Sequence, residues 1–319
     1  MLPPNWRRLP LATVASLAPV QKLEWGLARA SGIEVAVKRE DLLHPQLGGN
    51  KFYKLAGHLD AAEESGAARL LSFGGAFSNH LYALAAAGAA LGVPTVGIVR
   101  GERPSVLSPT LQDAQNMGME LRFVSRADYR QKTDPVWLAR LQQDFPGTYI
   151  VPEGGGGLAG AAGCRAWGAA AVALSPWTPD WIFLAAGTGS STAGVLASET
   201  GVPVCAVLTL KGGETEVSAM KAGIIAQAER LTSQDCACLP SLLLESNYHC
   251  GGYARFPSGL RQFAMEFEAE TGVPLDPVYT AKVFWAIAQK AQAGHWQPGT
   301  RILVLHSGGL QGRRGFSGL

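Results

Sequence analysis

The sequence is poor in charge and in cysteine, and it lacks a long apolar run. Charged residues make up 16% of its 319 residues and hydrophobic residues 47%, which excludes disorder as the main state and allows a large core. The 27 basic and 25 acidic residues nearly balance without a basic cluster, so nothing indicates a nucleic-acid partner. Five cysteines, an odd number in a long chain, argue against a disulfide framework and favour a reducing compartment.

No stretch reaches the ~18 uninterrupted apolar residues that a membrane-spanning helix needs. Two arginines followed by the apolar segment 9–20 resemble the start of a signal peptide. Pro10 and Pro19 interrupt that segment, and no small-residue cleavage site follows it. We therefore expect neither a membrane partner nor export.

Glycine, in contrast, is abundant, with 39 residues and no collagen-like period. Strand-like and helix-like patterns alternate along the chain, which predicts an α/β fold of parallel sheets covered by helices on both faces. The expected strands lie at 33–38, 69–73, 95–99, 120–124, 148–151, 181–186, 203–210, 242–245 and 301–306. The expected helices lie at 53–65, 79–91, 111–117, 134–145, 158–174, 191–199, 215–230, 259–271 and 280–293. The glycine run 154–157 is either a flexible surface turn or a hinge between two sheets.

The stretch GTGSST at 187–192 follows an apolar strand and opens a helix. Free N–H groups at a helix N-terminus and nearby hydroxyls make an anion site, although an ordinary strand-to-helix turn has the same pattern. A dinucleotide site is a poorer match, because the third glycine is displaced to Gly194 and no acidic residue follows about 20 positions later. A monophosphate therefore fits better than a pyrophosphate.

The stretch GGNK at 48–51 is the second candidate, with Lys54 one helical turn further on. Both lysines could simply be solvated. We interpret Lys51 instead as part of a loop that shapes a pocket, where a deprotonated amine can form a Schiff base. Lys54 would then neutralise a phosphate.

Three more stretches lie where strands and helices meet. Ser78 can cap the helix that starts at Asn79, and the stretch 78–80 is either plain capping or a second anion site suited to a substrate carboxylate. The stretch LDPVYT at 275–280 contains a turn-forming Asp-Pro and a tyrosine that can also be a core aromatic. HSGG at 306–309 ends the last strand, where ligands gather in open α/β sheets.

Together and in this order, these five motifs resemble the 1-aminocyclopropane-1-carboxylate deaminase/D-cysteine desulfhydrase family, from about residue 10 to 310. The family consists of pyridoxal-phosphate enzymes of the tryptophan-synthase-β fold, fold type II. The resemblance implies two domains, each a mostly parallel twisted sheet flanked by helices. Residues 1–55 plus 157–319 would form a large cofactor-binding domain, and residues 56–156 a small domain. It also implies a cytoplasmic homodimer that acts on a small amino acid.

The same resemblance assigns roles within the site. Lys51 would bind pyridoxal 5'-phosphate covalently and later move protons. The catalytic residues would be Lys51, Ser78, Tyr253 and Tyr279. The cofactor would be held by Lys51, Lys54, Asn79, Gly187, Thr188, Gly189, Ser190, Ser191, Thr192, Thr280 and Ser307. The substrate would contact Ser78, Asn79 and His80.

Three positions bear on the reaction. The deaminase has a glutamate where this chain has Thr280, a leucine where it has Ser307 and a glutamine where it has His80. All three favour β-elimination, which predicts conversion of D-cysteine and water to pyruvate, ammonia and hydrogen sulfide. Deamination of the cyclopropane amino acid, or of another D-amino acid or β-substituted alanine, stays open. So do a pyridoxal-phosphate-binding protein without turnover and, from the glycine loop alone, a nicotinamide-dependent oxidoreductase.

A metal site is not expected. Cys236 and Cys238, near His249 and Cys250, have C-x-C spacing rather than the C-x-x-C of structural zinc, and no second pair follows. We expect three further histidines to lie on the surface or in loops rather than to be ligands: His44, His58 and His295.

Overall fold

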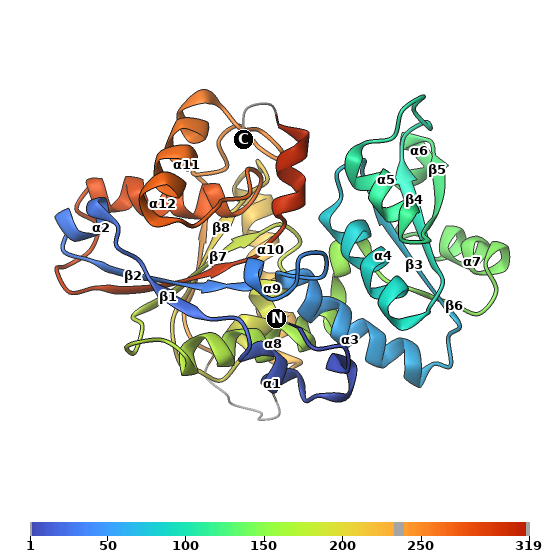
Figure 1. Ribbon diagram of the computed structural model, residues 1–319, viewed down its shortest axis with the longest axis horizontal. Helices are drawn as coiled ribbons and strands as arrows, with labels where there is room; N and C mark the ends of the chain where they lie inside the picture. Colours follow the sequence, from blue (N-terminus) through green and yellow to red (C-terminus); the bar gives the residue numbers. More distant parts are fainter. Residues whose placement is uncertain (1, 233–238, 317–319) are drawn as a thin grey trace.

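The structure is a computed structural model that describes residues 2–232 and 239–316, and it contains two separate sheets. The larger has strand order β1-β2-β10-β7-β8-β9, and the smaller has order β5-β4-β3-β6. Among the described strands, β1 alone runs antiparallel to its neighbour. Figure 1 shows the two sheets in two lobes, with β3–β6 on the right. The predicted fold class is confirmed.

The strands are β1 (Val20–Lys22), β2 (Glu34–Arg39), β3 (Arg69–Gly74), β4 (Thr95–Arg100), β5 (Glu120–Val124), β6 (Thr148–Ile150), β7 (Trp181–Ala186), β8 (Val204–Leu208), β9 (Leu242–Glu245) and β10 (Arg301–His306). The α-helices are α1 (Leu11–Ala15), α2 (Gly26–Ala30), α3 (Asn50–Glu64), α4 (Asn79–Leu91), α5 (Pro109–Asn116), α6 (Arg126–Tyr129), α7 (Pro135–Asp144), α8 (Gly157–Ala173), α9 (Ser190–Leu196), α10 (Glu214–Glu229), α11 (Ser258–Thr271) and α12 (Thr280–Gln292). The 3-10 helices are η1 (Trp6–Arg8), η2 (Glu40–Leu42), η3 (Glu153–Gly155) and η4 (Leu310–Gly315).

Both faces of the large sheet are covered, because neighbouring residues of its strands point to opposite sides. On β7, Leu184 packs into the core under α8, α9 and α10, while Phe183 packs into the core formed with α11 and α12. On β2, Ala36 faces the first core and Val37 the second. Because both faces of the central strands are buried, their sequences are continuous apolar runs.

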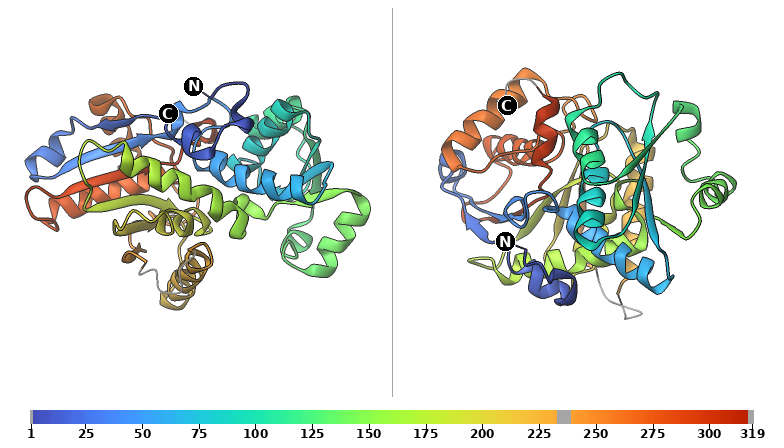
Figure 2. Two further views of the ribbon diagram at one scale, coloured as in Figure 1. Left: turned by 90° about the horizontal axis from the view of Figure 1, so that it is seen from below. Right: turned by 45° about the vertical axis from the view of Figure 1, so that its right-hand side comes forward.

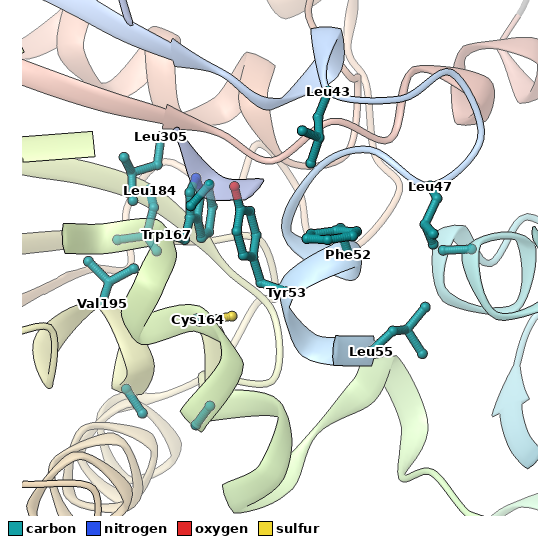
Figure 3. Packing of buried hydrophobic residues seen from close by; sticks show 14 of the residues in the cluster. Leu43, Leu47, Phe52, Tyr53, Leu55, Cys164, Trp167, Leu184, Val195 and Leu305 are labelled. Atoms are coloured by element: carbon teal, nitrogen blue, oxygen red, sulfur yellow. The ribbon is translucent and has the colours of Figure 1, made fainter. Parts of the chain in front are cut away.

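Helix α3 connects the two lobes and packs closely on α8. Side by side in the left view of Figure 2, the two helices approach backbone to backbone, since a Cβ at Gly163 would lie 1.9 Å from the carbonyl oxygen of Tyr53. The ring of Tyr53 stacks on Trp167 with 5.7 Å between centroids (Figure 3). The site lysines on α3 are thereby fixed to the large sheet. The helix is continuous across position 55, and the predicted domain boundaries stay a prediction.

Two expectations are wrong, and one of the two alternatives for the glycine run 154–157 is ruled out. Helix α3 begins at Asn50 rather than 53, because Gly49 adopts φ 81° at its N-cap, so Lys51 lies in a helical turn and not in a loop. His58 is buried in α3, where its ring nitrogens contact the Tyr149 hydroxyl and the Gly156 carbonyl oxygen, each at 3.0 Å. The glycine run is no surface turn, since Gly156 and its predecessor are buried where the chain passes between the sheets. Among the described helices, none combines the length and apolarity of a membrane span.

Candidate active site

A cavity of about 820 Å³ lies between the two sheets, where strands of both end. Its wall includes Gly74 of β3, Arg100 of β4, Ala186 of β7 and Ser307 after β10. Most of the predicted site residues line it: Lys51, Lys54, Ser78, Asn79, His80, Gly187, Thr188, Gly189, Ser191, Thr192, Tyr253, Tyr279 and Ser307. Ser190 and Thr280 do not line it.

Lys51 is positioned by two turns that touch through their backbones. A Cβ at Gly49 would lie 2.1 Å from the carbonyl oxygen of Ser307, and Asn50 N–H donates to that oxygen at 3.2 Å. Burial, reinforced by the charge of Lys54, lowers the pKa of Lys51 to about 7. A large fraction of the amine is therefore neutral near pH 7, the form in which a lysine is a nucleophile or a base.

Lys54 is a buried cation beside the 187–192 turn. Its Nζ donates to the carbonyl oxygen of Gly154 at 3.1 Å and to Thr188 Oγ1 at 3.5 Å, and no described carboxylate pairs with it. Thr192 Oγ1 is buried in the same turn without a hydrogen-bond partner. A buried ammonium and an unpaired hydroxyl at one turn fit a bound anion.

The turn itself has the geometry of a phosphate-binding loop. Gly189, at φ 84°, is the N-cap of α9, and a Cβ there would lie 2.7 Å from Ile224 Cγ1. Ser191 Oγ accepts a hydrogen bond from Asn50 Nδ2 at 3.0 Å, while Ser190 Oγ accepts from Gly157 N at 3.2 Å. Ser190 thus supports the loop from outside the cavity.

The 78–80 turn both caps helix α4 and leaves N–H groups free for an anion, the two alternatives that its sequence allowed. Ser78 caps α4, since its Oγ accepts from Leu81 N–H at 3.2 Å. The N–H groups of Asn79 and His80, in the first turn, have no acceptor within the helix and are available to an anion. Gln311 Nε2 donates to Asn79 Oδ1 at 2.6 Å, which leaves the Asn79 amide nitrogen as a donor.

His80 is neutral and has a defined tautomer. Ser72 Oγ donates to the carbonyl oxygen of Val151 at 2.8 Å, so at 2.8 Å from His80 Nε2 it accepts, and Nε2 carries the proton. Burial lowers the pKa of His80 well below its usual value. His80 therefore contributes no charge to the cavity, and its buried Nδ1 has no partner.

Asp276 is a cavity residue that the sequence argument treated only as turn chemistry. Its Oδ1 accepts from the N–H groups of Val278 at 3.1 Å and Tyr279 at 2.6 Å, which turns the carboxyl inward. Its Oδ2 is buried without a partner, and burial raises the pKa of Asp276 to about 7. Thr280 is buried behind it, with an Oγ1 that accepts from Asp276 N–H at 2.7 Å.

Two tyrosines form the wall opposite the small sheet. The rings of Tyr253 and Tyr279 meet edge to face with 6.3 Å between centroids. Tyr253 stays 50% exposed on a loop that Lys282 holds by donating to the carbonyl oxygen of Gly252 at 2.7 Å. Burial raises the pKa of Tyr279 well above its usual value, so its hydroxyl keeps its proton.

No group of three metal-ligating side chains occurs in residues 2–232 and 239–316. Cys236 and Cys238, the pair considered above for a metal, lie outside the described residues.

The model of a family described as "Pyridoxal-phosphate dependent enzyme" matches residues 16–308. The chain belongs to this family. Its cofactor is pyridoxal phosphate, which fits the buried Lys54 and the unpaired Thr192 hydroxyl and decides against a nicotinamide-dependent enzyme.

Comparison with named proteins and solved structures points to one group of enzymes within this family. A Pyrococcus horikoshii protein named "Putative 1-aminocyclopropane-1-carboxylate deaminase" is 30% identical over 302 residues, covering 92% of this chain and 90% of that protein. A D-cysteine desulfhydrase of Klebsiella pneumoniae is 24% identical over 96% of this chain and 95% of its own length. A solved ACC deaminase homologue superposes with a TM-score of 0.80 at 27% identity, covering 93% of this chain and 90% of the other. The predicted resemblance to the deaminase/desulfhydrase family is confirmed.

Proposed function

We propose that this enzyme is a D-cysteine desulfhydrase-like lyase that converts D-cysteine and water to pyruvate, ammonia and hydrogen sulfide. Bound pyridoxal phosphate supplies an electron sink for such chemistry. The observation that carries the choice of elimination is Ser307, which lines the cavity with a hydroxyl where the deaminase resemblance calls for leucine. Thr280 stands where the resemblance calls for glutamate and supplies no carboxylate, and its hydroxyl accepts from Asp276 N–H behind the cavity wall. A cytoplasmic homodimer is part of the proposal.

Lys51 is the proton carrier of the proposed reaction. Because burial lowers its pKa to about 7, the amine can take a proton from the substrate carbon and return one near neutral pH. The Ser78 hydroxyl and the first-turn N–H groups of α4 bind the substrate carboxylate, which the positive end of the helix favours. Asn79, oriented by Gln311, would donate from its amide nitrogen to the ring oxygen of the bound cofactor. Tyr279 acts as a hydrogen-bond donor and not as a base, since it keeps its proton.

Ring opening of the cyclopropane amino acid is the second candidate. It is favoured by the Asp276 carboxyl on the cavity wall and by the name of the 30% identical relative. A carboxylate near the cofactor ring strengthens the electron sink, which a reaction without a thiolate leaving group needs more.

The test supplies the purified enzyme with D-cysteine, L-cysteine, D-serine, β-chloro-D-alanine or the cyclopropane amino acid, and measures sulfide, pyruvate and ammonia. We expect sulfide and pyruvate in equal amounts from D-cysteine. Lys51→Ala should lose the visible absorbance of the bound cofactor and at least about 100-fold of the activity, whereas Lys221→Ala, at an exposed lysine of α10, should lose neither.

Each other outcome selects a different function. Ammonia from the cyclopropane amino acid without sulfide from D-cysteine would select the second candidate. A coloured protein that turns over none of these amino acids would be a cofactor carrier without catalysis. A protein that stays colourless after cofactor is added would contradict both enzymatic candidates.

A further inference from the structure

Arg100 presents an unpaired positive charge to the cavity. It is the last residue of β4, and the β3–β4 register, which pairs Gly74 with Val99, puts Gly75 opposite it. A Cβ at Gly75 would lie 3.7 Å from Arg100 Nη2, so the guanidinium lies over the turn that leads to Ser78. Within residues 2–232 and 239–316 it makes no hydrogen bond or ion pair, and it lines the cavity.

Glu153, an acidic residue that lines the same cavity, is engaged elsewhere. Glu153 accepts from the Tyr129 hydroxyl at 2.5 Å and lies 3.5 Å from Lys132 Nζ. Arg100 instead packs its guanidinium over the Tyr129 ring, with Cζ 5.9 Å from the centroid. Such stacking holds the planar group in one orientation and leaves its N–H edge free for an oxyanion.

Arg100 and Ser78 flank the same short turn from different sides. A Cβ at Gly74 would meet Ser78 Oγ at 2.5 Å, whereas the neighbouring Gly75 faces Arg100. The turn therefore has one anion-binding group at the start of α4 and a second at the end of β4. Both groups line the cavity, so Arg100 is available to the side chain of a substrate whose α-carboxylate is bound at Ser78.

We propose that Arg100 binds an acidic group carried on the substrate's β-substituent, so that β-substituted alanines with a second carboxylate or similar anion bind more tightly than D-cysteine, which has none. The proposal rests on the proposed function for the amino-acid site, and it adds a preferred substrate class to that function. The fork of N–H donors matches a carboxylate in a bidentate pair, which discriminates against a neutral side chain of the same shape.

The test uses the holoenzyme and a pair of nearly isosteric ligands, aspartate and asparagine, each as both enantiomers. Aspartate is a suitable probe because a carboxylate bonded directly to Cβ is not a leaving group. Dissociation constants are measured from the change in the bound cofactor's absorbance. We expect the wild type to bind the better aspartate enantiomer at least about tenfold more tightly than the matching asparagine.

Substitutions test whether Arg100 causes the preference for aspartate over asparagine. Arg100→Gln should abolish it and leave asparagine binding within about twofold, and Arg100→Lys should keep part of it. Arg255→Gln is the matched control, because Arg255 is an exposed arginine that lines the same cavity from the loop after Tyr253. It should leave the preference intact.

Three results would overturn the proposal: a wild type without the preference, an Arg100→Gln variant that weakens both ligands equally, or a preference lost in Arg255→Gln instead. The proposed function has a separate readout, the Lys51-dependent absorbance of the cofactor and sulfide release from D-cysteine. If the enzyme is coloured and releases sulfide but binds aspartate and asparagine equally well, only the role of Arg100 is refuted. A charge preference without sulfide release would refute only D-cysteine as substrate.

Discussion

At the scale of single residues, the protonation state of an ionisable side chain depends more on its surroundings than on which amino acid it belongs to. Burial brings the pKa of an amine, Lys51, down to about 7 and the pKa values of two carboxyls, Asp276 and Glu40, up to about 7. Glu40 has a partner in the buried Lys38, 3.2 Å away, but Asp276 Oδ2 has none. Replacement of Asp276 is therefore the most direct measure of how much a buried, unpaired carboxylate lowers the free energy of unfolding.

Asp276→Asn should remove a pH-dependent loss of stability. The carboxyl has a pKa of 3.8 when exposed and about 7 when folded, so its favourable contribution is complete below pH 3.8 and is lost as the pH rises through 7. Asparagine keeps the acceptor for Val278 and Tyr279 and does not ionise. In the cofactor-free protein, the variant should gain on the order of 1–4 kcal/mol relative to wild type between pH 5 and pH 8.

Thermal unfolding at several pH values measures this gain. Asp144→Asn, at an exposed position of α7, is the control and should show no change with pH relative to wild type. If the difference in melting temperature between Asp276→Asn and the wild type stays constant from pH 5 to pH 8, ionisation of Asp276 does not lower the stability of the folded protein.

At the scale of elements, the site depends on the close contact between α3 and α8. A Cβ at Gly57 would lie 2.0 Å from the carbonyl oxygen of Ala159, just as one at Gly163 would lie 1.9 Å from that of Tyr53. Two glycines therefore permit the approach, and α3 presents Lys51 and Lys54 only while it lies there. The sequence predicts both helices but not their contact, because each pattern is local and the glycines meet across 106 positions.

Gly163→Ala should separate the two helices. Because the new methyl group meets backbone that cannot rotate away, we expect a loss of about 1–3 kcal/mol in the free energy of unfolding and weaker cofactor binding. Gly223→Ala is the control within α10, where a Cβ meets nothing within 4 Å and the substitution should gain about 0.5–1 kcal/mol. Urea unfolding of both variants decides the matter, and equal stability of the two would refute the packing argument.

The sequence also leaves out elements that tertiary packing creates. The three-residue strand β1 and the five-residue helices α1 and α2 are too short to show a period, and they form against β2 and the neighbouring cores. In contrast, β7 and β10 appear at their predicted limits, because buried strands between turn residues carry a strong local signal.

At the scale of the whole molecule, the sequence predicts which stretches share the cavity but not every residue that completes it. SNH, GTGSST and HSGG follow strand ends, and parallel strands bring such ends to one edge, whereas GGNK opens helix α3. Arg100 and Gln311 belong to no motif, and Asp276 belongs to LDPVYT, where the sequence indicates only turn chemistry for it. Their positions depend on strand register, on the C-terminal turn and on a capped loop. Only the folded chain places them in the cavity that Lys51 lines.

The position of the cavity between both sheets predicts that the cofactor stabilises the molecule as a unit. A ligand that binds only the folded state at 100 times its dissociation constant adds about 2.7 kcal/mol. Pyridoxal phosphate should therefore raise the unfolding temperature of the cofactor-free protein by several degrees in a single calorimetric transition that includes both lobes. Inorganic phosphate, which we expect to contact only the turn at 187–192 and Lys54, should give a smaller shift, and Lys54→Met should reduce both shifts. A shift with phosphate alone that equals the shift with the cofactor would mean that the ring and Lys51 contribute nothing to holding the lobes together.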